Sequence, residues 1–439
     1  MIETSGFNVV SLLRGLLGII CIVGIAFLFS TDRKRIDWKL VGSGLLLQIV
    51  FALSILYVPF IETFFEFLGK IFVKILDFSQ VGVDFLLGPL ATKNNGVVFI
   101  IHSLPALIFF TALVSLLYHW GIIQRIVSFM SWILRFFLRN ISGSEGLVVA
   151  GNTFLGMTES PVLAKQYLSQ MNKSEIFLVM VSGMATIAGT VLGVYVGLLG
   201  EGDPVKQVFF AKHLLAASVM AAPGAIVLAK MIYPQTEQIE EKQSVDMKAE
   251  KEHSSAIEAL TAGTSTGLKL MVNVAAMLLV FIALVAFVNY ICEGVIGRHT
   301  GLNDWVATVT NGKSESFSIH FILGVLLSPL MWLIGIPVDD MMSVGALVGQ
   351  KTVLNEFVAY FQMQQWKSAG VFVYEKSVVM STYLLCGFAN ISSIGILLGG
   401  LGVLAPGKRP MVAQLGFRAM ITGAAVSILS ATIVGMILG

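Results

Sequence analysis

Charge is scarce in this sequence, because charged residues make up only 12% of its 439 residues while hydrophobic residues make up 56%. Soluble proteins carry about 25% charged residues, so an ordinary soluble enzyme is excluded. Disordered, collagen-like and coiled-coil chains need a biased polar or periodic composition that is absent here. The net charge of +2 gives no reason to expect nucleic-acid binding. What remains is an all-α polytopic membrane protein, whose length provides roughly eight to ten membrane helices.

The residue patterns of several chemistries are also missing. The three cysteines, Cys21, Cys292 and Cys386, stand far apart in apolar runs and form no disulfide or metal-binding pattern. The six histidines show no ligand spacing, and no phosphate-binding loop or nucleophile elbow occurs. ATP-driven pumping, metal-dependent catalysis and hydrolase chemistry are therefore disfavoured, and no cofactor is expected.

The basic residues predict the orientation of the chain in the membrane. The first apolar run, 15–30, is followed by the basic cluster 33–39, which indicates an uncleaved helix with its N-terminus outside the cytoplasmic (inner) membrane. Basic loops at 33–39, 125–139 and 408–409 then all fall on the cytoplasmic side. The further expected spans are 40–60, 97–118, 175–199, 209–233, 269–295, 377–404 and 412–438.

Other segments are too polar or too short to span the membrane. Charges spaced through 61–90 indicate an irregular amphipathic, interfacial or re-entrant segment. Arginines among aromatic residues indicate a helix lying on the cytoplasmic interface. The arginine-rich interfacial helix is 124–140. The other segments are the flexible or helical cytoplasmic linker 235–258, the polar loop 297–318 and a second interfacial helix, 319–336.

An internal repeat is indicated by two eight-residue segments, 183–190 and 387–394, in which Gly, Ala and Ile coincide in register. The first segment lies on an outward span and the second on an inward span. The halves are therefore candidates for an inverted repeat, which is typical of secondary transporters with a binding site near the midplane.

Two acidic residues, Glu159 and Glu356, stand in apolar sequence, where burying a charged carboxylate in the membrane costs free energy. Glycine and proline near Glu159 argue against a continuous lipid-exposed helix, since irregular backbone at membrane depth needs a cavity or surrounding protein. We therefore expect two re-entrant hairpins, 144–170 with its tip at 157–160 and 345–363 with its tip at Asn355 and Glu356.

Alternative interpretations without a binding role stay open for these polar residues. Both carboxylates could lie in aqueous loops, and Asn390 and Ser393 could simply join helices. A passive channel or facilitator, or an intramembrane enzyme using Glu159 and Glu356 as acid and base, are functional alternatives. No nucleophile or metal constellation accompanies the pair of carboxylates, which disfavours the enzyme.

Five segments together resemble the concentrative nucleoside transporter family, in a bacterial form, with the resemblance covering residues 95–439. They are GNTFLGMTESP at 151–161, GMATIAGTVL at 183–192, SVMAAP at 218–223, VLNEFVAY at 353–360 and CGFANISSI at 386–394. The resemblance implies a homotrimer in the inner membrane. Each protomer would have about eight transmembrane helices, two re-entrant hairpins and interfacial helices. It also implies sodium- or proton-coupled nucleoside uptake by alternating access.

The resemblance also divides the chain into a scaffold and a moving transport domain. The expected units are scaffold helices 1–118, a first repeat 119–233, a cytoplasmic linker 234–265, a scaffold helix with an outer loop 266–318 and a second repeat 319–439.

Site residues follow from the resemblance one position at a time. Thr158 and Glu159 match the hairpin residues that face the nucleobase, whereas Met157 stands where the family has glutamine. A thioether is at best a weak acceptor, so an altered base preference is expected rather than lost transport. The remaining substrate-binding matches are Glu356, Asn390 and Ser393 for the ribose and Val191 and Phe388 around the base.

The sodium site of the family matches Asn152 and Thr186 by side chain and Leu155 and Ile187 by backbone carbonyl. Neutral oxygens alone suit a hard monovalent cation, so sodium is the favoured coupling ion. The alternative is a proton-coupled symporter in which Glu159 or Glu356 carries the proton.

Overall fold

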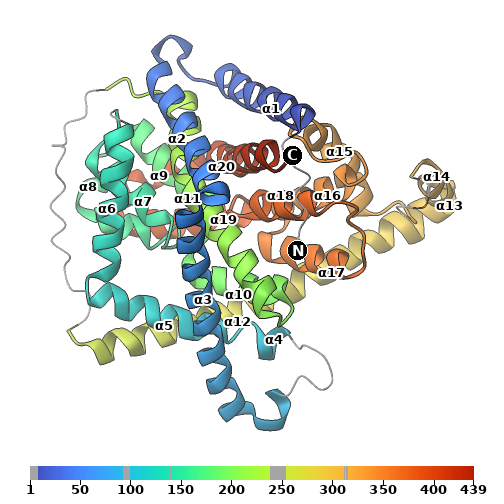
Figure 1. Cartoon of the computed structure of the whole chain (residues 1–439), viewed down its shortest axis with the longest axis horizontal. Helices are drawn as coiled ribbons and strands as arrows, with labels where there is room; N and C mark the ends of the chain where they lie inside the picture. Colours follow the sequence, from blue (N-terminus) through green and yellow to red (C-terminus); the bar gives the residue numbers. More distant parts are fainter. Residues whose placement is uncertain (1–7, 92–98, 139, 238–253, 311, 313–314) are drawn as a thin grey trace.

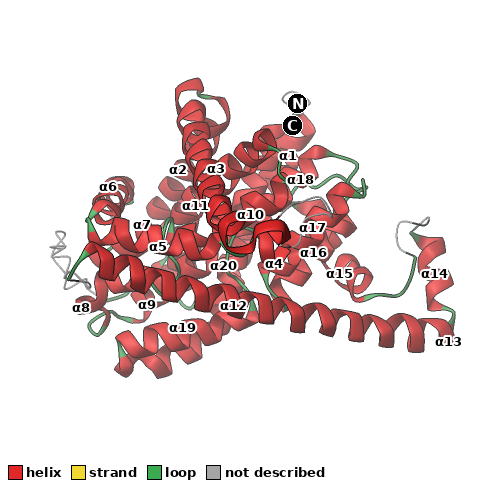
Figure 2. Cartoon of the chain, turned by 90° about the horizontal axis from the view of Figure 1, so that it is seen from below, coloured by secondary structure: helices red, strands yellow, loops and turns green. Residues whose placement is uncertain are grey.

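The described residues of the chain form helices joined by short connections (Figure 1). This computed structural model describes residues 8–91, 99–138, 140–237, 254–310, 312 and 315–439. Within these ranges no residue belongs to a β-strand, and the view in Figure 2 shows the helices crossing at several angles. The all-α fold expected from the composition is thereby confirmed.

Seven helical stretches of the described chain are long and apolar enough to cross a membrane. They correspond to seven of the eight expected spans. They are α1 (Val9–Leu28), α2 (Trp38–Tyr57), α4 and α5 (Phe99–His102 and Ala106–His119), α9 and α10 (Lys173–Ala185 and Gly189–Gly200), α11 (Pro204–Ile232), α12 with its continuation (Ala256–Thr300) and α20 with the preceding turn (Pro406–Leu438). The eighth expected span is divided into α18 (Glu375–Leu385) and the shorter apolar helix α19 (Ile391–Leu404).

Two long helices, α11 and α20, form the centre of the molecule (Figure 1). They contact each other, and both also contact α9 and α18. In the most apolar 18-residue stretch of α11, 89% of the residues are buried, and in that of α20 72% are buried. In the corresponding stretch of α12 only 11% of the residues are buried. A helix that is apolar on all sides must be surrounded, so α11 and α20 hold the two broken helix pairs, α9–α10 and α18–α19, in place.

The same order of elements occurs twice along the chain. An apolar or amphipathic helix is followed by a helical hairpin, a broken helix pair and a long helix. In the first half these are α6 (Ile122–Phe137), α7 (Gly143–Asn152) with η4 (Ser160–Ala164) and α8 (Lys165–Leu168), then α9–α10 and α11. In the second half they are α15 (Ile319–Leu333), α16 (Met341–Val353) with α17 (Glu356–Ser368), then α18–α19 and α20. The inverted orientation of the two sets and the re-entrant nature of the hairpins stay predictions.

Helix α3 (Pro59–Leu87) is one continuous helix rather than an irregular segment, and it is not among the described helices that are apolar enough to cross a membrane, in line with the amphipathic segment expected from its charges. Lys212 of α11 lies 2.8 Å from Glu62 and 3.8 Å from Glu66. Lys212, from a distant part of the chain, therefore compensates two of the acidic residues that distinguish this segment from an apolar span.

Two predicted polar connections are also partly helical. Helix α12 (Ala256–Asn289) begins within the expected linker 234–265, and residues 238–253 of that linker lie outside the described residues. The expected outer loop 297–318 contains α13 (Arg298–Thr300), at the far end of α12, and α14 (Leu302–Val309), which turns out of the line of α12 in Figure 2. Ser255 caps the new helix start by accepting a hydrogen bond from the Glu258 backbone N–H.

At one end of the molecule, hydrogen bonds link loops and helix ends that are far apart in sequence. This end contains the basic cluster 33–39 and the loop before α20. The contacts are Thr31 N to Ile232 O (2.9 Å), Asn140 Nδ2 to Asp37, Lys408 Nζ to Met171 O (2.7 Å) and Arg418 Nη1 to Tyr233 Oη (2.8 Å). The described residues of the three predicted cytoplasmic loops therefore belong to, or lead into, one end of the fold.

The other end gathers the start of α1 and the ends of α2, α10 and α17. The contacts are Lys376 Nζ to Ser11 Oγ (3.0 Å), Tyr57 Oη to Ile437 O (2.9 Å) and Ser368 Oγ to Glu201 Oε1 (2.5 Å). Helices α9–α10 therefore run from the first end to this one, while α18–α19 begin at this end.

Candidate functional site

The two broken helix pairs meet at their breaks. Helix α9 ends at Ala185 and α18 ends at Leu385. The Phe388 N–H donates to the Thr186 carbonyl at 3.3 Å. Gly387 has φ +135°, and a Cβ there would lie 2.9 Å from the Ala185 carbonyl oxygen, so only glycine permits this approach. Broken helices leave backbone groups free to bind a ligand, which makes this crossing the natural place for a site.

A buried carboxylate, Glu356, lies at the tip of the second hairpin with 3% of its surface exposed. Its Oε1 accepts a hydrogen bond from the Tyr195 hydroxyl at 3.2 Å, and its Oε2 accepts one from Asn390 Nδ2 at 2.9 Å. The carboxylate thus joins α17, α10 and the start of α19. An ionised carboxylate has about four lone-pair sites, so it can accept further O–H donors from a ligand.

Asn390 also caps helix α19. Its Oδ1 accepts from the Ser393 N–H at 2.9 Å and from the Ser393 hydroxyl at 3.0 Å. All three predicted ribose-binding residues, Glu356, Asn390 and Ser393, are therefore joined in one hydrogen-bonded group. Such a group fixes its side chains in advance, which reduces the ordering cost when a ligand binds.

The tip of the first hairpin contacts both broken helix pairs. Met157 is buried, and a Cβ on Gly183 of α9 would lie 2.7 Å from its Cβ. Thr158 lies against α19, where a Cβ on Gly400 would be 2.7 Å from its Cγ2. The Glu159 carboxylate accepts from the Gly156 N–H at 3.1 Å. Met157 therefore lies against α9 and Thr158 against α19.

A second polar group lies where the first hairpin meets α9. Asn152 is fully buried, and its Nδ2 donates to Ser182 Oγ at 2.9 Å. Thr186 donates to the Ser182 carbonyl at 2.9 Å. The buried Asn152 Oδ1 has no hydrogen-bond partner among the described residues. An orphaned buried oxygen is costly, so this atom is well suited to a cation ligand.

The two backbone positions predicted for the ion site lie on irregular chain beside Asn152. Leu155 and Ile187 are buried, and no turn or loop hydrogen bond between described residues uses either carbonyl. The Gly189 N–H donates to the Phe154 carbonyl at 3.0 Å, which ties the hairpin to the start of α10. The available oxygens are all neutral, which fits a monovalent cation better than a divalent one. Among the described residues, no three or more His, Cys, Asp or Glu side chains form a group suited to a metal ion.

The apolar residues predicted around the base also lie at the crossing. Val191 is buried in the first turn of α10, one helical turn before Tyr195, and Phe388 is partly buried in the second break. The sequence prediction did not include Tyr195, Ser182 or Lys351, which contact the predicted residues or the same breaks. Tyr195 could have been found from its four-residue spacing to Val191, and Ser182 from its place beside the glycine of the repeated motif.

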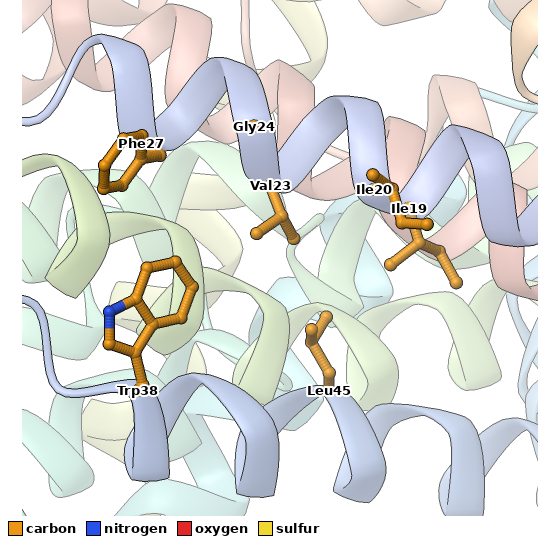
Figure 3. Close-up of a pocket in the computed structure, with 7 residues that line it drawn as sticks. All are labelled: Ile19, Ile20, Val23, Gly24, Phe27, Trp38 and Leu45. Atoms are coloured by element: carbon orange, nitrogen blue, oxygen red, sulfur yellow. The ribbon is translucent and has the colours of Figure 1, made fainter.

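A shallow groove between α1 and α2 lies apart from this crossing (Figure 3). Its lining is apolar except for the indole nitrogen of Trp38, and the labelled side chains come from both helices. It lacks the convergent polar groups of a small-molecule site, so we assign the candidate site to the crossing.

Family comparisons cover nearly the whole chain. Residues 17–90 match the N-terminal part and residues 213–435 the C-terminal part of the Na+ dependent nucleoside transporter family. Residues 100–202 match a family described as nucleoside recognition. The matched regions include all the predicted site residues.

Relatives and solved structures agree with these matches. The chain is 36% identical to the nucleoside permease NupC of Helicobacter pylori, covering 100% of this chain and 99% of that protein. It is 34% identical to sodium/nucleoside cotransporter 1 of Rattus norvegicus over 96% of this chain and 63% of that protein. It also resembles CNTnw in an inward-facing, substrate-bound state, with a TM-score of 0.86, 35% identity and coverage of 97% and 99% of the two chains. These proteins are transporters rather than enzymes, and the chain belongs to the concentrative nucleoside transporter family.

Proposed function

We propose that this nucleoside transporter is a sodium-coupled symporter that imports nucleosides across the cytoplasmic membrane by alternating access. The observation that carries the sodium assignment is the buried, unpartnered Oδ1 of Asn152 beside Thr186, where the first hairpin meets the broken helix α9–α10. The family names of the N-terminal and C-terminal matches support the same ion.

The ribose would bind at the group formed by Glu356, Asn390 and Ser393. Vicinal ribose hydroxyls are two adjacent O–H donors, and a carboxylate accepts them with charge-assisted strength. Tyr195 and Asn390 already donate to Glu356, which holds the carboxylate in one orientation before the sugar arrives. The Ser393 hydroxyl donates to Asn390 Oδ1, so its oxygen would accept a hydrogen bond from a sugar hydroxyl.

The nucleobase would lie between the first hairpin and the start of α10. Thr158 and Glu159 would meet the polar edge of the base, while Val191 and Phe388 would cover its faces. Met157 occupies the position of the family's glutamine and lies against Gly183. It cannot replace the donor and acceptor of an amide, so we propose an altered base preference.

Sodium would bind to Asn152 Oδ1, the Thr186 hydroxyl and the Leu155 and Ile187 carbonyls. The ion would join the hairpin to the break in α9–α10 and thereby order Met157, Thr158 and Glu159. Coupling follows because sodium raises nucleoside affinity by the same factor as nucleoside raises sodium affinity.

Alternating access would move a transport domain made of the two repeats, 119–233 and 319–439, against a scaffold of 1–118 and 266–318. The opposite directions of α9–α10 and α18–α19 between the two ends of the molecule support an inverted repeat. The contacts that join the basic loops at one end support a cytoplasmic placement of that end and an external N-terminus. We further propose a homotrimer, for which the largely exposed, 45-residue helical stretch beginning with α12 offers an extended surface.

Uptake into proteoliposomes tests this proposal. Labelled uridine and adenosine are supplied with either an inward sodium gradient or an inward proton gradient at equal osmolarity. Accumulation driven by sodium alone is expected. Accumulation driven by protons alone would assign the coupling to Glu159 or Glu356, and equilibration without accumulation under either gradient would indicate a facilitator.

A further inference from the structure

A lysine lies inside the second hairpin at a depth where a charged amine is unusual. Lys351 of α16 is only 1% exposed. Its Nζ donates to the Leu384 carbonyl at 2.8 Å and to the Ser427 hydroxyl at 3.3 Å. Burying an ammonium group costs free energy unless its N–H groups have acceptors and its charge is compensated. These contacts therefore indicate a specific role for Lys351.

The acceptors of Lys351 belong to the break between α18 and α19. Leu384 is in the last turn of α18, and the Ser427 hydroxyl of α20 donates to the carbonyl of Cys386, the first residue after that helix. The C-terminal end of a helix carries partial negative charge on its free carbonyls, which a cation stabilises. Lys351 therefore places a positive charge on the end of the first half of this broken helix pair.

The first repeat has the corresponding arrangement without a charged side chain. Asn152 ends the first arm of its hairpin, α7, as Lys351 lies near the end of the first arm of the other hairpin, α16. Asn152 contacts Ser182 in the last turn of α9, as Lys351 contacts Leu384 in the last turn of α18. The difference is that Asn152 leaves a buried oxygen without a partner, whereas Lys351 brings its own cation.

We propose that the Lys351 ammonium is a built-in cation at the second repeat's counterpart of the sodium site. It would hold the second hairpin to the break in α18–α19 as sodium holds the first hairpin to the break in α9–α10. This inference rests on the proposed sodium site of the first repeat. It assigns a single sodium to each nucleoside, because the counterpart position already has its positive charge.

Lys351 also acts on the ribose site as a positioning residue. Glu356 follows it across the hairpin tip, and the two opposite charges lie close enough to interact. Figure 1 shows α16, α17 and α18 grouped together, and α16 contacts both of the others. Removal of the ammonium leaves the carboxylate of Glu356 with less compensation and the Leu384 carbonyl without its donor, so nucleoside affinity should fall.

Two substitutions separate the charge from the space that the side chain fills. Lys351→Met keeps most of the volume and removes the charge, while Lys351→Ala leaves room for an added alkylammonium ion. Lys165→Ala in α8, an exposed lysine of the first hairpin, is the control. Uridine binding to purified protein is measured in a sodium-containing buffer. Methylammonium or ethylammonium is added to one set of samples and tetramethylammonium, at equal ionic strength, to the control set. Gel filtration confirms folding.

We expect Lys351→Met to weaken uridine binding by about tenfold or more, the effect of losing the charge-assisted hydrogen bonds to the Leu384 carbonyl and the Ser427 hydroxyl. Small alkylammonium ions should restore binding to Lys351→Ala, and tetramethylammonium should not, because it has no N–H donor. A purely structural role would show no such selective rescue. Near wild-type binding by Lys351→Met, or a folded Lys351→Ala that no amine restores, would overturn the inference.

The wild-type protein provides a test that needs no variant. Sodium-driven uridine uptake should depend on sodium with a Hill coefficient of about one. A coefficient of about two would show a second sodium and overturn the inference even if neither Lys351 variant folds. Wild-type uptake that does not depend on the sodium concentration would instead refute the proposed sodium coupling. Failure of the Lys351 inference and failure of the sodium coupling are therefore distinguishable.

Discussion

The Glu356→Gln exchange tests the ribose site with a nearly isosteric change. The protein's own contacts can adapt to it, since the amide oxygen can face Asn390 Nδ2 while the amide NH2 donates to the Tyr195 hydroxyl oxygen. The contacts of the carboxylate with these two side chains are 2.9 and 3.2 Å long. The fold should therefore survive, and the loss should fall on the sugar hydroxyls that the charged carboxylate would accept.

The magnitude follows from the burial of Glu356, which is 3% exposed and thus little screened by water. Loss of a buried charged partner costs about 2–5 kcal/mol, which corresponds to roughly 30- to 5,000-fold in affinity. Because the ligand loses charge-assisted hydrogen bonds, 2′-deoxyuridine should lose less affinity than uridine on the same exchange.

Uridine and 2′-deoxyuridine binding by isothermal titration calorimetry measures this effect, with uptake into proteoliposomes in parallel. Glu66→Gln is the matched control, because Glu66 lies on α3, has a side chain that is 40% exposed and is far along the chain from the hairpin. Near wild-type uridine uptake by Glu356→Gln would refute the ribose assignment.

Three further exchanges test other parts of the site and the fold. Met157→Gln should shift the base profile, measured by competition among uridine, cytidine, adenosine, inosine and guanosine; an unchanged profile would count against a base contact. Tyr195→Phe removes one donor to Glu356 and should weaken uridine binding about fivefold, the effect of about 1 kcal/mol, while an unchanged affinity would contradict the orienting role. Lys230→Met leaves its buried ion-pair partner Glu145 uncompensated and should lower the free energy of unfolding by about 3–5 kcal/mol, seen as a lower melting temperature in detergent. A melting temperature equal to that of the wild type would show that the pair does not stabilise the fold.

The hairpin tips could be predicted because their signal is local. A carboxylate beside glycine and proline in an apolar run has few places to lie, and the structure puts a chain reversal at both Met157 and Glu356. The exact helix breaks could not be predicted in this way. The sequence pattern places Thr186 and Asn390 inside the spans 175–199 and 377–404 without giving the residues at which the helices end, whereas the structure ends α9 at Ala185 and starts α19 at Ile391.

Features that depend on partners from distant segments were missed for a physical reason. The charges of 61–90 do not reveal that this segment is one regular helix with Lys212 beside Glu62 and Glu66. Likewise, Tyr195, Ser182 and Lys351 gain their roles only when two helix breaks and two hairpins come together. Such contacts have long sequence separations, so no local pattern carries them.

The measurement that tests the central claim most directly is the affinity for uridine as a function of sodium concentration, in the wild type and in Asn152→Ala, with choline replacing sodium. Sodium should raise wild-type affinity by about 5- to 150-fold, the usual size of a coupling between two sites. Asn152→Ala should lose most of that increase while its sodium-free affinity stays close to that of the wild type. An equal sodium effect in both proteins, or no sodium effect in the wild type, would contradict a sodium site that orders the first hairpin.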